Sequence, residues 1–259
     1  MCALFTAAHA VTAQGKRKPG VLPTPTPIPT AVASPTPSDP LPEKKNGRPV
    51  DTAANQKAAE RNAALAGYTP VYFYKFERDG FTYSKILIEH DEKGKGKISF
   101  QKEDRDEIIE DPISLSTVTT ERLTNAFAAL SFLTSNETYQ TPVDHSNLGN
   151  VTVKEKKDGK EREATFNWTT NPNAKLIMDE YRHIANEYTW KFEIAGAREN
   201  QRLLTPGLMD AIDGYLSRNE ISDPPTLVPF LSELSQDEKL PLIARNHAAR
   251  LIKQIEKKK

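Results

Sequence analysis

The stretch YTPVYFYKFERDGFTYSKILIEH, residues 68–90, carries the strongest structural pattern in the chain. Aromatic and β-branched side chains, which favour strands, fill both of its halves. The pair Asp79-Gly80 separates the halves and can supply the positive φ angles of a tight type I′ turn. The stretch therefore predicts two antiparallel strands, the first ending before Asp79 and the second running from Phe81 to His90.

Further strands are predicted on either side of a helix. KISFQK (97–102) and EIIEDPISL (107–115) are the third and fourth strands, and Pro112 marks an edge or a bend. Residues 148–155 and 161–168 predict another hairpin around Asp158-Gly159. Between these pairs, hydroxyl side chains at 116–119 offer a helix cap. Apolar residues then recur at helical spacing, at Leu123, Phe127, Leu130 and Leu133.

The remainder of the chain predicts helices. One long helix begins near Asn171-Pro172 and keeps a single apolar stripe to about Arg202, formed by Ile177, Tyr181, Ile184, Tyr188, Phe192 and Ala195. Three short amphipathic helices follow, opened by Thr205-Pro206, by Asp223-Pro224, and by Asp237 with Pro241. The fold class that we predict is α+β: an antiparallel sheet of hairpins with helices on one face, followed by a small all-α C-terminal cap.

The N-terminal part of the chain has a composition that does not favour a core. Ten of the 19 prolines lie between Pro19 and Pro49, in runs such as PTPTPIPT. Proline fixes φ and lacks an N–H, so this region predicts an extended polyproline-II spacer. A plain solvated tail, a reach across a cell-wall layer, and a ligand for a proline-binding partner all fit it. Residues 51–66 contain good helix formers without an apolar stripe and predict only a marginal helix.

The first residues, MCALFTAAHAVTA, resemble the back half of a secretory signal peptide. Val11 and Ala13 place small residues at the −3 and −1 positions before Gln14. The basic opening of such a peptide is missing, so we expect the true start to lie upstream. The resulting division is a signal-peptide remnant (1–13), a proline-rich disordered spacer (14–66), an α+β domain ending in a long helix (67–203), and a C-terminal helical region (204–259).

Composition limits the possible partners. Thirty-five basic and 35 acidic residues cancel, so no overall charge favours nucleic acid or an anionic membrane. The single cysteine, Cys2, cannot form an internal disulfide. No apolar run is long enough for a membrane-spanning helix.

Two segments carry a resemblance, NEYTWKFEIAGARENQRLLTPGLMDAI (186–212) and DEKLPLIARNHAARLIKQIEK (237–257). They resemble uncharacterised exported bacterial proteins that couple a small α+β module to a short helical C-terminus. The resemblance covers about residues 68–257 and implies no known activity, because its motifs are not catalytic signatures.

Several polar motifs are weak candidates for chemistry. His145 lies between Asp144 and Ser146, but adjacency in sequence does not build a catalytic triad. The acidic run 103–111 lacks the glycine and the alternating ligands of a calcium loop. His247 lies on the apolar face of a predicted helix, which is typical of a hydrogen-bonded boundary residue, and His90 and His183 are isolated.

Basic and aromatic groups give no firmer assignment. The basic ends 16–18 and 253–259 have no interleaved aromatic residues of the kind that a single-strand nucleic-acid surface would use. Five aromatic residues could form a ligand platform, although about half of them must be core: Tyr72, Tyr74, Tyr83, Trp168 and Trp190. We therefore assign no catalytic, cofactor-binding or metal-ligating residue, and we expect no cofactor.

Three functions follow from these patterns. The favoured hypothesis is an exported, periplasmic or extracellular, non-enzymatic module that binds an unknown protein or a cell-envelope component. The alternative is a hydrolase whose scattered polar groups, such as Asp144, His145 and Glu180, converge only in the fold. Nucleic-acid binding through the basic ends is the third and least favoured hypothesis. The sequence does not predict an oligomeric state.

Overall fold

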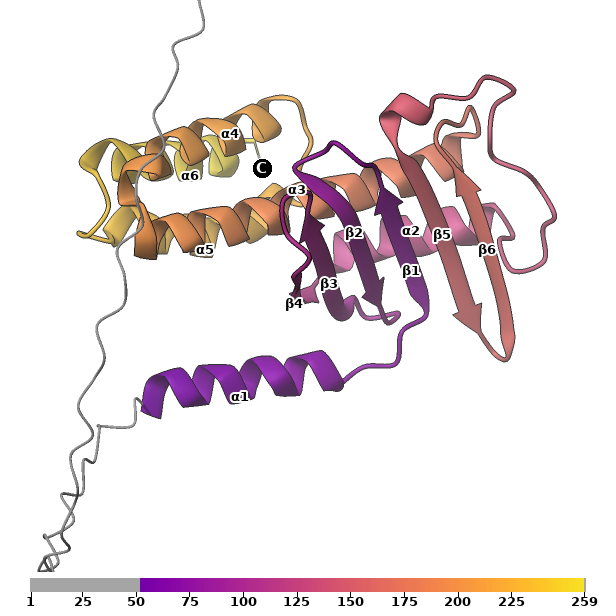
Figure 1. Cartoon of the computed structure of the whole chain (residues 1–259), viewed down its shortest axis with the longest axis horizontal. Coiled ribbons are helices and arrows are strands. Elements are labelled where there is room, and N and C mark those ends of the chain that lie inside the picture. Colours follow the sequence, from indigo (N-terminus) through magenta and orange to yellow (C-terminus); the bar gives the residue numbers. More distant parts are fainter. Residues whose placement is uncertain (1–51, 259) are drawn as a thin grey trace, which may run out of the picture. The chain divides into compact units, whose positions relative to one another are not determined.

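The structure is a computed structural model that describes residues 52–258, with side chains from residue 59 onward (Figure 1). The predicted signal-peptide remnant and the proline-rich runs lie outside the described residues. The elements follow one another in this order: α1 (Thr52–Ala66), β1 (Tyr72–Glu77), β2 (Tyr83–His90), β3 (Lys95–Lys102), β4 (Ile108–Ser114), α2 (Thr117–Ala129), β5 (Asn150–Lys157), β6 (Lys160–Phe166), α3 (Pro172–Asn200), α4 (Thr205–Ser217), α5 (Val228–Gln236) and α6 (Leu242–Lys257). Short 3₁₀ turns occupy Ser146–Leu148 (η1), Arg202–Leu204 (η2) and Pro224–Leu227 (η3).

The strands form one antiparallel sheet in the order β4-β3-β2-β1-β5-β6. The two hairpins of the sequence therefore meet along β1, which pairs with both β2 and β5. Pro112 lies in β4, an edge strand, where its missing N–H costs no ladder hydrogen bond. The predicted α+β class is confirmed.

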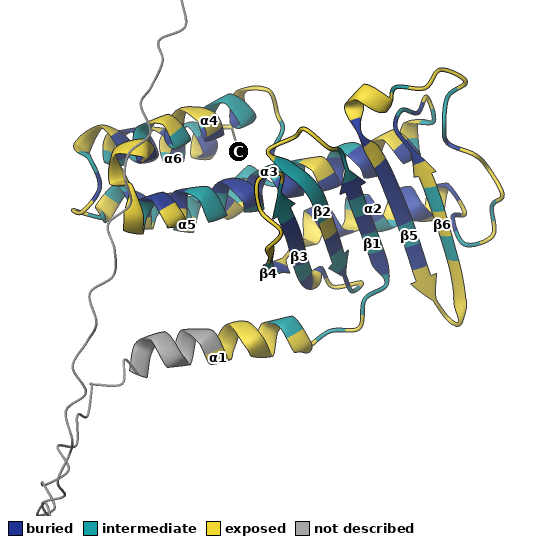
Figure 2. Cartoon of the chain, viewed as in Figure 1, coloured by how far each residue is buried: buried dark blue, intermediate teal, exposed yellow. Residues whose placement is uncertain are grey.

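One face of the sheet is covered by α2 and α3 (Figure 2). On β1, alternate residues Tyr72, Tyr74 and Phe76 are buried against these helices, whereas Phe73 and Lys75 lie on the opposite face and are only half-buried. Successive side chains of a strand point to opposite faces of the sheet. Although β1 carries aromatic residues on both faces, only the face toward α2 and α3 is therefore buried. Ser116 caps α2 by accepting a hydrogen bond from the Thr119 N–H, as the hydroxyl cluster predicted.

The C-terminal half of α3 builds a second core with α4, α5 and α6. Its Trp190 and Ile194 are buried there, and the Trp190 indole N–H donates to the Leu208 carbonyl at 2.8 Å. The two cores share α3, so the helical region is fixed to the sheet by one continuous helix. Of the helices among residues 52–258, none combines the length and the apolar character needed to cross a bilayer.

A buried polar network adds a second connection between the two cores. Glu180 of α3 pairs with Arg122 of α2 at 2.7 Å and accepts a hydrogen bond from the Ser222 hydroxyl, in the connection between α4 and α5. Arg122 also donates to the Ser222 carbonyl at 2.6 Å. Because the single Ser222 hydroxyl proton goes to Glu180, the Thr119 hydroxyl donates to the Ser222 oxygen.

Three local predictions need correction. Asp79 does not have a positive φ angle, so the β1–β2 connection is not a type I′ turn but the longer segment 78–82. The Asp158-Gly159 turn, by contrast, has positive φ angles at both residues, 51° and 74°. Thr205 does not cap α4; it is the first residue of that helix, and its hydroxyl donates to the Arg202 carbonyl.

The third correction concerns the apolar stripe of α3. Ile177, Tyr181 and Ile184 are buried as predicted, but farther along the helix Ala195 is exposed. The buried face there turns to the residues that meet α4 to α6. Residues 52–66, which the sequence grouped with the spacer, form helix α1, and its Arg61 pairs with Asp111 of β4 at 3.0 Å.

Candidate functional site

The candidate functional site is a groove of about 820 Å³ between the β1–β2 connection, α3 and α4. Its volume lies within the range typical of small-ligand pockets. Six of its residues are aromatic and come from four separate parts of the chain: Tyr74 and Phe76, Phe81 and Tyr83, Trp168, and Tyr215.

One wall of the groove is a face of α3. Arg182, Ala185, Asn186, Thr189 and Glu193 line it, and their spacing places them along one side of a helix. These residues lie along the middle of α3. The part of α3 before them packs on the sheet, and the part after them packs on α4 to α6. On this face Ala185 and Thr189 are buried, Asn186 and Glu193 are half-buried, and Arg182 is exposed.

The second wall comes from the β1–β2 hairpin. The centres of the Phe81 and Phe76 rings are 5.9 Å apart, and the Arg78 guanidinium lies over the Phe81 ring, 5.6 Å from its centre. Phe81 is 42% exposed, so much of its ring remains accessible from solvent. With a two-residue turn at Asp79-Gly80, Phe81 would be paired within strand β2. In the longer connection 78–82, Phe81 lies outside the paired strands, and its ring is exposed at the groove.

The third wall is built by the segments around Leu148 and Trp168. Gly149 has a φ angle of 84°, and a Cβ atom there would lie 2.5 Å from the Phe76 ring, so only glycine allows this close approach. The Asn167 side chain fixes the wall: it accepts a hydrogen bond from the His145 backbone N–H at 3.1 Å and donates to Asp144.

Two of the charged residues that line the groove, Glu193 and Arg182, are paired within the protein. By contrast, Arg78 beside Phe81 forms no ion pair among residues 59–258 and donates from Nε to the Asn147 carbonyl. Glu193 pairs with Lys102 at 2.6 Å and accepts a hydrogen bond from the Tyr83 hydroxyl. Burial would raise the pKa of Glu193, but these two hydrogen bonds hold it below its usual value. Burial, and then the neighbouring Glu193, raise the pKa of Tyr83, so its hydroxyl stays protonated and acts as a donor. Arg182 lies 3.6 Å from Asp179 on its own helix.

The uncharged polar groups of the groove fall into two classes. Thr189 donates to the Ala185 carbonyl, and Asn186 donates to the Glu220 carbonyl, so both are committed. The indole N–H of Trp168 and the hydroxyl of Tyr215 make no hydrogen bond to the side chains or backbone of residues 59–258. The groove thus offers apolar aromatic surface with a small number of free donors.

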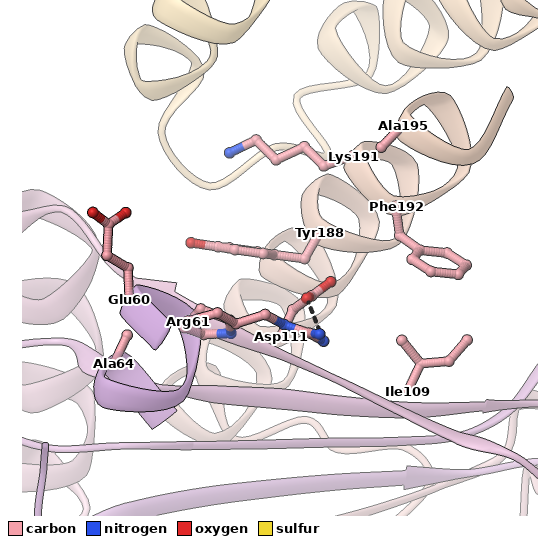
Figure 3. Close-up of a pocket in the computed structure, with 10 residues that line it drawn as sticks. Glu60, Arg61, Ala64, Ile109, Asp111, Tyr188, Lys191, Phe192 and Ala195 are labelled. Atoms are coloured by element: carbon pink, nitrogen blue, oxygen red, sulfur yellow. Dashed lines mark ion pairs between the residues drawn. The ribbon is translucent and has the colours of Figure 1, made fainter. Parts of the chain in front are cut away.

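A second cavity, of about 890 Å³, lies beside the edge strand β4 and is lined from the other sides by α1 and α3 (Figure 3). The Arg61–Asp111 ion pair lies in it, and Tyr188 and Phe192 face it from α3. Burial raises the pKa of Asp111, although Arg61 acts in the opposite direction. Its aromatic rings come from one helix only, so a planar ligand would be contacted from one side. The groove is the better candidate for this reason.

The residues that the sequence singled out for chemistry do not converge. Asp144 and His145 meet at Asn167, whereas Glu180 belongs to the network with Arg122 and Ser222. Within residues 59–258, Glu180 shares no hydrogen-bond partner with the other two. Asp144 and His145 instead support the wall of the groove.

The remaining histidines are held by neighbouring groups. His90 is fully buried; its Nδ1–H donates to the Asp91 carbonyl and its Nε2 accepts from Tyr181 at 2.9 Å. Burial lowers the pKa of His90 to about 4 and, to a smaller extent, lowers the pKa of the half-buried His183. His247 is nearly buried and lies between α4 and α6, with Nε2 3.1 Å from Asp213.

The charged runs have similarly ordinary surroundings. In the acidic run, Glu110 pairs with Lys97 at 3.0 Å, and Asp111 pairs with Arg61. In the part of the chain that the structure describes, no three His, Cys, Asp or Glu side chains gather as a metal-binding group. The basic C-terminal end forms the exposed last turn of α6.

The proposed aromatic platform is divided by the fold. Tyr83 and Trp168 line the groove and are half-buried, whereas Tyr72 and Tyr74 belong to the sheet core and Trp190 to the helical core; Tyr74 also borders the groove. Sequence reasoning missed Phe76, Phe81 and Tyr215 as groove residues. Phe81 follows the Asp79-Gly80 pair directly. Had the sequence been interpreted as a longer connection instead of a two-residue turn, Phe81 would have been predicted outside the strands. Nothing in the sequence pointed to Tyr215. Comparison with protein-family models and with curated proteins finds no match.

Proposed function

We propose that this chain is an exported, non-enzymatic binding module that holds a ligand in the groove between the β1–β2 connection, α3 and α4. The observation that carries the proposal is the lining of that groove: six aromatic residues border it, and four of them, Phe81, Tyr83, Trp168 and Tyr215, keep part of their surface exposed. Such a surface binds through apolar contact and ring stacking and needs only a few donors for orientation.

The chemistry of the lining favours binding over catalysis. A hydrolytic site needs a nucleophile within hydrogen-bond reach of a base, with an oriented third group. The Tyr83 hydroxyl is the polar group most nearly in such an arrangement, but its partner Glu193 is neutralised by Lys102. The carboxylate is thereby a poor base, and the tyrosine remains a neutral hydrogen-bond donor.

Export is supported by the sequence of residues 1–49 and is proposed on that ground. The small residues before Gln14 fit a cleavage site, and the proline-rich runs fit a spacer between an envelope surface and the folded part. N-terminal sequencing of protein recovered from the cells that make it, together with fractionation, tests this part. Recovery of the cytoplasmic form with Met1 intact would refute it.

The groove is tested by site-specific photocrosslinking. A benzoylphenylalanine placed at Phe81 of the full chain should form a covalent adduct with an envelope component in intact cells. The matched control is Leu87, which is on the open face of the sheet and similarly exposed, 38% against 42%. We expect adducts at Phe81, none at Leu87, and loss of the Phe81 adducts when Trp168→Ala is added. Equal adducts at both positions would mean that the groove is not the binding site.

A further inference from the structure

We infer that the ligand of the groove is an uncharged saccharide whose pyranose rings have all their substituents in equatorial positions, as in a β-1,4-linked glucan. The inference rests on the proposed function, because it names the class of ligand for the same groove. Three properties of the lining support it: aromatic rings on separate walls, unused donors together with unused acceptors, and the balance of charge.

The first property is that partly exposed aromatic rings lie on separate walls of the groove. Phe81 belongs to the β1–β2 connection, Trp168 to the segment after β6, and Tyr215 to α4. A ligand in the groove therefore meets aromatic surface on more than one side. A pyranose with only equatorial substituents directs its axial C–H bonds to both faces, so both of its faces are apolar. An axial hydroxyl would put a polar group against one of the aromatic rings and weaken binding.

These rings are also held in place by neighbouring side chains. The Arg218 guanidinium lies over the Tyr215 ring, 5.6 Å from its centre, and Phe81 has a guanidinium over its ring in the same manner. The centres of the Trp168 and His145 rings are 5.7 Å apart. A side chain that is fixed before the ligand arrives loses little conformational entropy on binding. The groove thus presents preorganised surfaces, which suit the stiff ring of a sugar.

The second property is hydrogen bonding, and it begins with the donors. The indole N–H of Trp168 and the hydroxyl of Tyr215 have no hydrogen-bond partner among residues 59–258. Arg182 approaches Asp179 only to 3.6 Å, which is beyond hydrogen-bond distance, so its exposed N–H groups can also donate to a ligand. These donors come from three separate parts of the chain.

The lining also contains unused acceptors. Both Tyr83 and Lys102 meet Glu193 at Oε1, so Oε2 has no hydrogen-bond partner within residues 59–258. Asn186 donates its amide N–H to the Glu220 carbonyl, and its own Oδ1 accepts nothing from that part of the chain. A hydroxyl group donates one hydrogen bond and accepts two, so saccharide hydroxyls can satisfy both kinds of group. A carboxylate or phosphate only accepts and would leave these two acceptors unsatisfied.

The third property is the balance of charge. Arg182 has Asp179 beside it, and Glu193 has Lys102. Arg78, beside the hairpin wall, is the one charged group at the groove without an ion pair in residues 59–258. An anionic ligand would therefore meet one unpaired guanidinium and would also face the Glu193 carboxylate. An uncharged ligand avoids the cost of burying a charge without a partner.

Isothermal titration calorimetry of the full chain with defined hexasaccharides tests the inference. Cellohexaose and chitohexaose have only equatorial substituents, β-1,4-mannohexaose has one axial hydroxyl on each ring, and the β-1,4-linked hexamer of glucuronate adds negative charge to the equatorial pattern. We expect cellohexaose or chitohexaose to bind with a Kd below about 1 mM, and the other two to bind at least about tenfold more weakly. The tighter of the first two probes identifies a plain or an N-acetylated glucan as the ligand.

Three variants connect the binding to the groove. Trp168→Ala removes a ring from the lining and should weaken binding at least about tenfold. Tyr215→Phe keeps the ring and removes the hydroxyl, so it should weaken binding about two- to tenfold. The control is Phe73→Ala, because Phe73 is a half-buried aromatic residue on the open face of the sheet, and it should leave the Kd unchanged. Far-UV circular dichroism checks that each variant folds.

Each other outcome overturns the inference. Absence of binding by both cellohexaose and chitohexaose at about 1 mM rejects the saccharide. Equal binding of mannohexaose would mean that the faces of the sugar are not recognised, and tighter binding of the glucuronate hexamer would mean that the ligand is an anion. Binding that Trp168→Ala and Tyr215→Phe leave unchanged would place the saccharide outside the groove.

The Phe81 photocrosslink separates this inference from the proposed function. Adducts at Phe81 in cells without binding of any hexasaccharide would retain the proposed function and reject the saccharide as ligand. Saccharide binding that depends on Trp168, without adducts in cells, would retain the saccharide site and reject the envelope component as its partner.

Discussion

The buried His90 makes a quantitative prediction about stability and pH. Its imidazole is fully buried in the sheet core, and burial lowers its pKa from 6.5 to about 4. In the unfolded chain the same side chain takes up a proton near pH 6.5. Between these two values the unfolded state binds more protons than the folded state. Stability is therefore fully present above pH 6.5 and is lost as pH falls toward 4.

The magnitude follows from the two pKa values. At 1.36 kcal/mol per pKa unit, the linkage relation gives a loss of about 2 kcal/mol from His90 between pH 7 and pH 5, and about 3 kcal/mol by pH 4. Acidic groups and His183 also change stability over this range. The measured quantity is therefore the difference in the free energy of unfolding between wild type and His90→Gln. The contributions of the other titrating groups cancel in this difference.

The assay is urea unfolding of the full chain at pH 7, 6 and 5, followed by circular dichroism. His90→Gln should cost about 1–3 kcal/mol at pH 7, because the contacts to Asp91 and Tyr181 are replaced imperfectly. Its deficit should shrink by about 2 kcal/mol at pH 5, since glutamine does not titrate. The control Ile194→Ala removes a non-titrating side chain from the helical core, away from His90, and should retain the wild-type dependence on pH. A deficit for His90→Gln that stays constant from pH 7 to pH 5 would refute the reasoning.

Three further predictions concern packing and the shape of the groove. Ser222→Ala leaves Glu180 without its hydroxyl donor and should lower the free energy of unfolding by about 1–3 kcal/mol, whereas the exposed Ser217→Ala should change it by less than about 0.5 kcal/mol in the same urea assay. Ile194→Ala removes a fully buried side chain from the helical core and should cost about 2–5 kcal/mol; a cost below about 1 kcal/mol would contradict the assigned burial. Gly159→Ala meets no neighbouring atom and should cost only the strain of its positive φ angle, about 1–2 kcal/mol. Gly149→Ala has a similar φ angle and a clash with Phe76, so thermal unfolding should show a larger loss, by about 1–3 kcal/mol, and equal losses would remove the close-approach argument.

The sequence alone determined the elements and the fold class. Alternating residues in 71–76 predicted β1, the hydroxyl side chains at 116–119 predicted the start of α2, and Pro112 predicted an edge or a bend, of which the structure has the edge. These features depend on the periods of strands and helices and on contacts within a few residues, and such contacts are already present in a short stretch of chain. The Asp158-Gly159 turn was predictable for the same reason.

The groove was decided by the tertiary structure. Its walls come from Phe81, Leu148, Trp168, a face of α3, and Tyr215, which are far apart in the sequence. No local pattern says that α3 changes its buried face, because that change depends on α4 to α6 packing against its second half. Five aromatic residues looked alike in the sequence, but Tyr83 and Trp168 line the groove, Tyr72 and Tyr74 lie in the sheet core, and Trp190 lies in the helical core. Whether an aromatic side chain is core or surface depends on which distant elements cover it, and only the packing of the whole chain fixes that.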